Sequence, residues 1–126
     1  MTKVTFLKRG GAYYGFHETG HTGWGESGDD VLCAALSAMT MLIINVIEVS
    51  YGSSVEYTID EKTTDITVKA YGAVNDPDDR KRFAISGLIE GYFLQLSDML
   101  EDYYDYLDVE EISEDANVRS DSLDRK

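Results

Sequence analysis

The chain has 126 residues, of which 43% are hydrophobic, and it carries a net charge of -13 and a single cysteine. This length fits one domain, and the apolar content excludes a wholly disordered protein. The single cysteine excludes an intramolecular disulfide, and the negative charge makes nucleic acid a poor partner because it repels phosphate groups.

The charge is concentrated towards the C-terminus. From Asp98 onward there are 11 acidic and 3 basic residues. An acidic segment of this kind either attracts a basic peptide or protein or only keeps the chain soluble. The charge by itself leaves both interpretations open.

The first twenty residues predict a β-hairpin. Apolar and polar residues alternate in residues 4–9, Gly10-Gly11 allows a tight turn, and a second strand follows at about 12–18. No apolar signal-peptide run precedes the hairpin. We therefore expect a soluble, cytoplasmic protein in a reducing compartment.

A glycine-rich segment, residues 20–28, leads into a long apolar helix. Ser27 and Asp30 have the spacing of a capping box, which predicts the start of this helix, and the apolar run continues to about Val49. The run is marginal as a membrane span because polar residues interrupt it. We expect a buried central helix and no association with a membrane.

The second half of the chain repeats the order of hairpin and helix. Alternating residues at 55–59 and 66–70 predict another hairpin. Asp76-Pro77 predicts the capped start of a last helix, whose apolar stripe reaches Tyr103.

These elements predict one α+β domain in ββαββα order. Two helices cover an antiparallel sheet made of the two hairpins, which gives a layered domain. The periodicity stops after Leu107. We expect the domain to span residues 1–107 and an acidic, disordered tail to span residues 108–126.

Residues 20–37 bring together side chains with catalytic chemistry. Cys33 lies in the second turn of the expected helix, where the helix dipole mildly favours a thiolate. His21 lies across the glycine-rich loop, and a neighbouring imidazolium lowers the pKa of a thiol. Asp30 lies one turn before Cys33 on the same helix face. Since a carboxylate alone disfavours a thiolate, its useful role is to orient His21.

The same residues have simpler interpretations, which the spacing alone leaves open. A lone cysteine in an apolar helix is usually a core residue, a histidine in a loop is usually exposed, and Asp30 is explained as a capping acid. Trp24 either lines a site or anchors the loop to the core. Ser37 bonds either to the site or back to its own helix. No residues have the spacing of a metal site or a phosphate-binding loop, so we expect no metal and no cofactor.

The motif nevertheless resembles the signature of a known family, the Prp ribosomal-processing cysteine proteases. The matching positions are Gly20-His21, Gly28-x-Asp30 and Cys33-Ala34-Ala35-x-Ser37, with twelve residues from His21 to Cys33. The resemblance extends over about residues 1–105. It departs at Gly25 and Leu32, which are not among the three candidate catalytic residues.

The resemblance implies a specific reaction. Members of this family remove the N-terminal extension of a bacterial large-subunit ribosomal protein, cut after an aromatic residue, and form homodimers with a mobile loop over the active site. By the same resemblance, Cys33 is the nucleophile, His21 is the base and then the acid, and Asp30 is auxiliary. Gly20, Trp24 and Ser37 would belong to the substrate-binding loop and its surroundings. The loop would keep His21 away from Cys33 until substrate binds.

Two other functions remain open from the residues themselves. A non-catalytic ribosome-assembly or basic-protein binding module would use the acidic surface and leave Cys33 inert. A thiol redox protein would need a reactive Cys33, but the chain has no second cysteine to resolve an oxidised thiol. The reactivity of Cys33 therefore separates these functions from one another.

Overall fold

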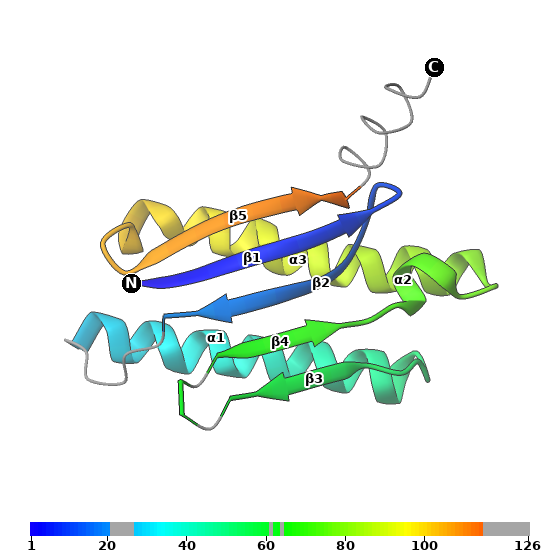
Figure 1. Cartoon of the computed structure of the whole chain (residues 1–126), viewed down its shortest axis with the longest axis horizontal. Coiled ribbons are helices and arrows are strands. Elements are labelled where there is room, and N and C mark those ends of the chain that lie inside the picture. Colours follow the sequence, from blue (N-terminus) through cyan, green and yellow to red (C-terminus); the bar gives the residue numbers. More distant parts are fainter. Residues whose placement is uncertain (21–26, 61, 64, 115–126) are drawn as a thin grey trace, which may run out of the picture.

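A computed structural model describes residues 1–20, 27–60, 62–63 and 65–114 (Figure 1). The strands are β1 (Thr2–Arg9), β2 (Ala12–Thr19), β3 (Glu56–Ile59), β4 (Ile66–Lys69) and β5 (Leu107–Ser113). The helices are α1 (Ser27–Asn45), which continues into a π-helical turn η1 (Val46–Ser50), α2 (Gly72–Asn75) and α3 (Asp79–Tyr103). The α+β class expected from the sequence is confirmed.

The five strands form one mixed sheet in the order β3-β4-β2-β1-β5. The first four pair antiparallel, as two hairpins joined through β2 and β4. The last strand, β5, runs parallel to β1, with Thr2 opposite Leu107 and Lys8 opposite Ser113. Both long helices lie behind the sheet in Figure 1, α1 across β2, β4 and β3 and α3 across β1 and β5.

The core fills the space between the sheet and the two long helices. Strand residues Val4, Phe6 and Phe16 and helix residues Leu36 and Ile89 are fully buried in one core cluster. Aromatic rings form the centre of this core: Tyr92 contacts the edges of Phe6 and Phe16 at centroid distances of 5.5 and 5.0 Å. Because the inward positions alternate along β1 and recur every third or fourth residue on α3, the two periodicities of the sequence account for the core.

The expectation of a disordered tail from residue 108 is wrong for residues 108–113, which form most of β5. The carboxylates of this strand are not simply solvated, because they meet polar and basic residues of the first hairpin. Glu110 pairs with Lys3 at 3.3 Å, and Glu111 accepts a hydrogen bond from the Tyr13 hydroxyl at 2.7 Å. The sheet is therefore mixed, not wholly antiparallel, and the ββαββα order is extended by a strand. Residues 115–126 lie outside the described residues.

The start of α3 also differs from the expectation. The helix cap is Asp78, whose side chain accepts a hydrogen bond from the backbone N–H of Arg80 at 2.8 Å. The side chain of Asp76 does not cap the helix; it accepts a hydrogen bond from the backbone N–H of Asp78, before the helix begins, at 2.8 Å. Both aspartates are thus used, but Pro77 lies before the helix and not at its first position.

Residues Val31–Ser50 are long and apolar enough, by length and composition, to cross a membrane, with a mean hydropathy of 2.0. The core helix of a soluble protein passes the same test. The inner face of this segment packs on the sheet through buried residues such as Leu32, Leu36 and Ile47. Its outer face leaves Met41 and Leu42 exposed. The helix is therefore a core element with an uncovered apolar side.

Candidate active site

Cys33 lies in the second turn of α1, at the edge of the face that packs on the sheet. Its side chain is half-buried, whereas those of Leu32 and Leu36 beside it are fully buried. The thiol is therefore placed at a boundary and not in the centre of the core. The N-terminal end of a 19-residue helix also favours an anion at this position.

The surface of α1 next to Cys33 is formed by small residues. Ala34 and Ser37 are exposed and Ala35 is half-buried. None of these three positions carries a large side chain. Ser37 lies one turn after Cys33, as expected, and its exposure is compatible with either of the two roles considered for it.

Gly20 directly follows β2, the strand that leads to the His21 half of the motif. Its φ of +82° is a conformation that residues with a side chain rarely adopt. A Cβ atom here would lie 2.3 Å from the carbonyl oxygen of Met1, so the backbone of Gly20 packs directly against the N-terminus. The backbone conformation and the contact with Met1 therefore explain why the Gly-His pair begins with glycine, directly after β2.

The side chains of the remaining predicted site residues, His21, Trp24 and Asp30, are outside the described part of the structure. His21 and Trp24 lie outside the described residues, as does the loop that was expected to hold His21 away from the thiol. The backbone of Asp30 belongs to the first turn of α1, one turn before Cys33, but its side chain is not described. The roles of these three residues stay predictions.

A buried carboxyl group that the sequence analysis did not single out lies near this end of the sheet. Glu18, on β2, is fully buried, and its Oε1 accepts hydrogen bonds from Thr40 Oγ1 on α1 at 2.9 Å and from the Tyr92 hydroxyl on α3 at 2.6 Å. Burial raises the pKa of the Glu18 carboxyl, and the hydrogen bonds from Tyr92 and Thr40 partly oppose this effect. The sequence contains one indication of this burial: Glu18 continues the series of alternate, inward-facing strand positions formed by Tyr14 and Phe16.

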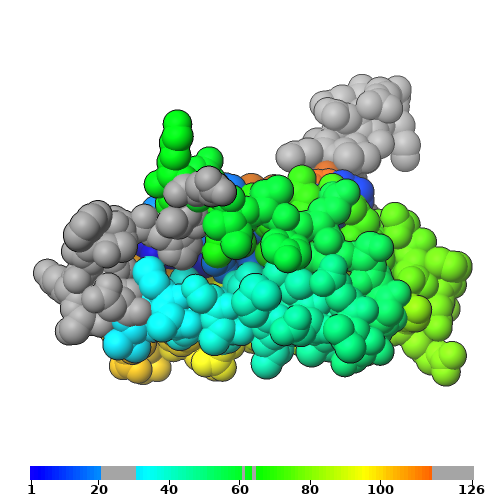
Figure 2. All heavy atoms as spheres, turned by 90° about the horizontal axis from the view of Figure 1, so that it is seen from below, coloured from blue at the N-terminus to red at the C-terminus, as the bar shows by residue number. Residues whose placement is uncertain are grey.

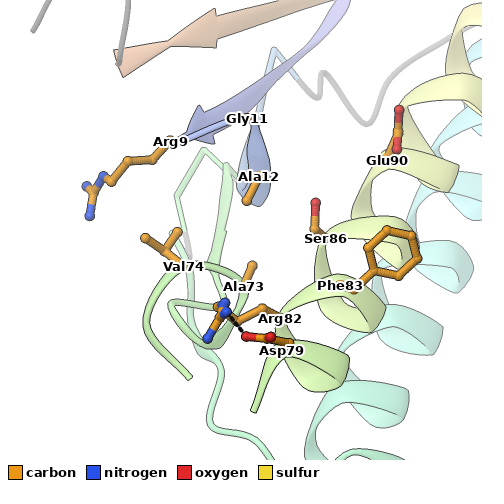
Figure 3. Close-up of a pocket in the computed structure, with 11 residues that line it drawn as sticks. Arg9, Gly11, Ala12, Ala73, Val74, Asp79, Arg82, Phe83, Ser86 and Glu90 are labelled. Carbon is orange, nitrogen blue, oxygen red and sulfur yellow. Dashed lines mark hydrogen bonds and ion pairs between the residues drawn. The ribbon is translucent and has the colours of Figure 1, made fainter. Parts of the chain in front are cut away.

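A cavity of about 420 Å³ lies at the opposite end of the sheet, under the Gly10-Gly11 turn (Figure 3). Its basic groups are already paired: Arg82 with Asp79, and Arg9 with Glu114 at 2.9 Å. Because β2 runs from this turn to Gly20, the cavity is separated from Cys33 by the length of the strand. Within the described ranges, no three His, Cys, Asp or Glu side chains are grouped to hold a metal ion.

Comparison with known proteins identifies the class to which this fold and motif belong. The family model described as "Cysteine protease Prp" matches residues 1–108. The chain therefore belongs to the Prp family of cysteine proteases. A search of curated proteins returned no match.

Solved structures show the same fold. SMU.848 from Streptococcus mutans is similar with a TM-score of 0.75 and 26% identity, over 90% of this chain and 98% of that one. The ribosomal processing protease Prp from S. aureus, solved with a substrate peptide, is similar with a TM-score of 0.73 and 17% identity, over 89% of this chain and 100% of that one. The same protease with a covalently linked product peptide has a TM-score of 0.70 and 18% identity, over the same shares of the two chains.

Proposed function

We propose that this cysteine protease removes the N-terminal extension of a bacterial large-subunit ribosomal protein by cutting after an aromatic residue. The observation that carries the proposal is the position of Cys33. It is a half-buried thiol near the start of α1, inside the signature motif, in a chain whose family match spans residues 1–108. The S. aureus protease is called a ribosomal processing protease and was solved with a substrate peptide and with a covalently linked product peptide, which supports the same reaction class here.

The proposed reaction proceeds through a thioester. The Cys33 thiolate attacks the scissile carbonyl, and the C–N bond breaks as the His21 imidazolium gives its proton to the leaving amine. His21, now neutral, takes a proton from water, the resulting hydroxide attacks the thioester, and the Cys33 thiolate leaves. Asp30 is the auxiliary residue that holds His21 in one tautomer. A carboxylate has little use beside the thiolate itself, because its charge would raise the pKa of the thiol.

The open surface around Ala34 and Ser37 is where the substrate backbone would lie. Gly20 follows β2 and begins the proposed substrate-binding loop, in which Trp24 is proposed to contact the aromatic residue at the cleavage site. The small side chains support this placement, since an extended peptide needs to approach the thiol closely for attack. The site of action is proposed to be the cytoplasm, where ribosomal proteins are made.

The partner of the uncovered face of α1 is proposed to be a second copy of the chain. Figure 2 shows α1 crossing the front of the molecule with its outer face open. A groove of about 260 Å³ lies between α1 and α3, and its lining includes Met39, Leu42, Ile43 and Leu88 together with Gly87 and Gly91. Leu42 is 56% exposed. A second apolar helix is the occupant that matches this shape and chemistry, and a homodimer supplies it.

The experiment that tests the proposed function is mass spectrometry of the extended ribosomal protein after incubation with wild-type protein and with Cys33→Ala. A single cut near the N-terminus, made by the wild type alone, is the expected result. Stable binding of the substrate by both proteins without any cut would contradict the proposal and favour a non-catalytic binding module with an inert Cys33.

A further inference from the structure

The buried bond between Thr40 and Glu18 joins the two elements on which the candidate catalytic residues depend. Glu18 is 0%, Thr40 3% and Tyr92 4% exposed, so all three side chains of the cluster are inside the core. Thr40 belongs to α1, the helix that carries Cys33, and Glu18 belongs to β2, the strand that ends just before Gly20-His21. The Thr40 hydroxyl donates to Glu18 Oε1 across the helix–sheet interface at 2.9 Å.

The Thr40–Glu18 hydrogen bond lies a short distance along the chain from both Cys33 and Gly20. Cys33 precedes Thr40 by seven residues, which is two helical turns on one face and a rise of about 10 Å. Gly20 follows Glu18 by two residues, which span about 7 Å of extended chain. In Figure 1, α1 begins at the end of the sheet where β2 finishes, so both segments extend from the bond towards the same end of the molecule. The bond therefore links the helix that carries Cys33 to the last part of β2.

The cluster is poorly explained as a simple stabilising contact. A carboxyl group taken out of water costs free energy, and a hydrogen bond returns only part of that cost. The raised pKa of Glu18 reports the same cost, because burial is its largest cause. Neighbouring positions show that apolar residues fit this interface, since Phe16 and Leu36 are fully buried in it. What an apolar pair cannot provide is a directional bond that fixes the helix along and around its axis.

We propose that Glu18 and Thr40 are positioning residues of the protease, whose hydrogen bond holds the Cys33-bearing helix in register with the strand that leads to His21. This inference rests on the proposed function. Tyr92 donates to the same carboxylate oxygen but from α3, which carries none of the candidate catalytic residues. Loss of either donor removes one hydrogen bond to the same oxygen, but only the bond from Thr40 joins the helix that carries Cys33 to β2.

The test compares Thr40→Val with Thr40→Ser and Tyr92→Phe in the cleavage of a peptide that contains the processing site. Thr40→Val removes the hydroxyl at nearly constant shape, Thr40→Ser keeps it, and Tyr92→Phe is the matched loss of a donor to the same oxygen. Each variant is assayed at a temperature where circular dichroism shows it fully folded. The expected result is a kcat lowered about 10- to 100-fold by Thr40→Val with little change in KM, and near wild-type kcat for the other two.

The outcomes separate this inference from the function on which it rests. An active wild type with unchanged kcat in Thr40→Val overturns the positioning role alone, and so does an equal loss of kcat in Thr40→Val and Tyr92→Phe. A wild type that makes no Cys33-dependent cut overturns the proposed function and the positioning role together.

Discussion

Position 20 requires glycine for two independent physical reasons. A comparison with the same substitution at Gly10 separates them. A residue with a Cβ at its φ of +82° is strained by about 1–2 kcal/mol, and the Cβ would also meet the Met1 carbonyl oxygen at 2.3 Å. Gly10 has a similar φ of +63°, but a Cβ atom there would meet nothing within 4 Å.

We therefore predict that Gly20→Ala lowers the free energy of unfolding by clearly more than Gly10→Ala, whose loss is limited to about 1–2 kcal/mol of backbone strain. Urea unfolding followed by circular dichroism measures both. Equal losses in the two variants would show that the end of β2 moves away from the N-terminus without difficulty, and that the close approach has no energetic weight.

The buried carboxyl of Glu18 makes the stability of the protein depend on pH. Because burial raises the pKa of this group above its ordinary 4.5, the folded state binds the proton more tightly than the unfolded chain does. Its stabilising contribution is therefore fully present below about pH 4.5 and is lost as the pH rises through the folded-state pKa.

We predict that the wild type loses stability relative to Glu18→Gln as the pH rises from about 4.5 upward, since glutamine keeps an acceptor oxygen but does not titrate. Urea unfolding of both proteins over this range gives the difference directly. A difference that is constant with pH, or that changes in favour of the wild type, contradicts the raised pKa.

Single residues also show what the sequence is able to predict about the site. Cys33 is located by the coincidence of a motif and a helix start, and its position in the second turn of α1 agrees with the structure. Glu18 is assigned by its pattern to the end of a strand but is not recognised as buried. Its burial depends on α1 and α3 closing over the same side chain, which is a tertiary event that the local pattern does not contain.

At the level of elements, substitutions in β5 test whether the acidic C-terminal segment belongs to the domain. Leu107 begins the strand and is 2% exposed, whereas Ile112, in the same strand, is 44% exposed. We predict that Leu107→Ala lowers the free energy of unfolding by about 2–5 kcal/mol and Ile112→Ala by no more than about 0.5 kcal/mol. Thermal or urea unfolding measures both losses. Two negligible losses would mean that the segment does not pack on β1 in solution.

The elements differ in how well the sequence predicts them, for identifiable reasons. The first hairpin and α3 have clear periodicities, and α1 is a capped apolar run, so these elements are expected close to their observed bounds. Strand β5 is missed because its Asp and Glu residues conceal the alternation. Their partners, such as Lys3 and Lys8, lie about a hundred residues away, and no local pattern indicates such pairs. Pro77 suits a first helical turn and so favours Asp76 as the helix cap, but Asp78 supplies it.

At the level of the whole molecule, a charged substitution on the open face of α1 tests the proposed homodimer. Leu42 lines the groove between α1 and α3 and is 56% exposed, while Leu94 on α3 is 54% exposed and does not line it. We predict that Leu42→Asp converts the dimer to a monomer because it places a charge in a desolvated interface, and that Leu94→Asp does not. Sedimentation velocity at micromolar concentration distinguishes the species. A monomeric wild type would contradict the dimer.

The central claim is that Cys33 is the nucleophile of a protease, and the most direct measurement is detection of its thioester. A peptide that contains the processing site is mixed with wild-type protein, the reaction is quenched with acid, and the adduct is located by peptide mapping with mass spectrometry. The account predicts that the acyl part of the substrate is attached to Cys33 and that no adduct forms in Cys33→Ala. Cleavage without an adduct on Cys33, or cleavage by Cys33→Ala, would contradict the account.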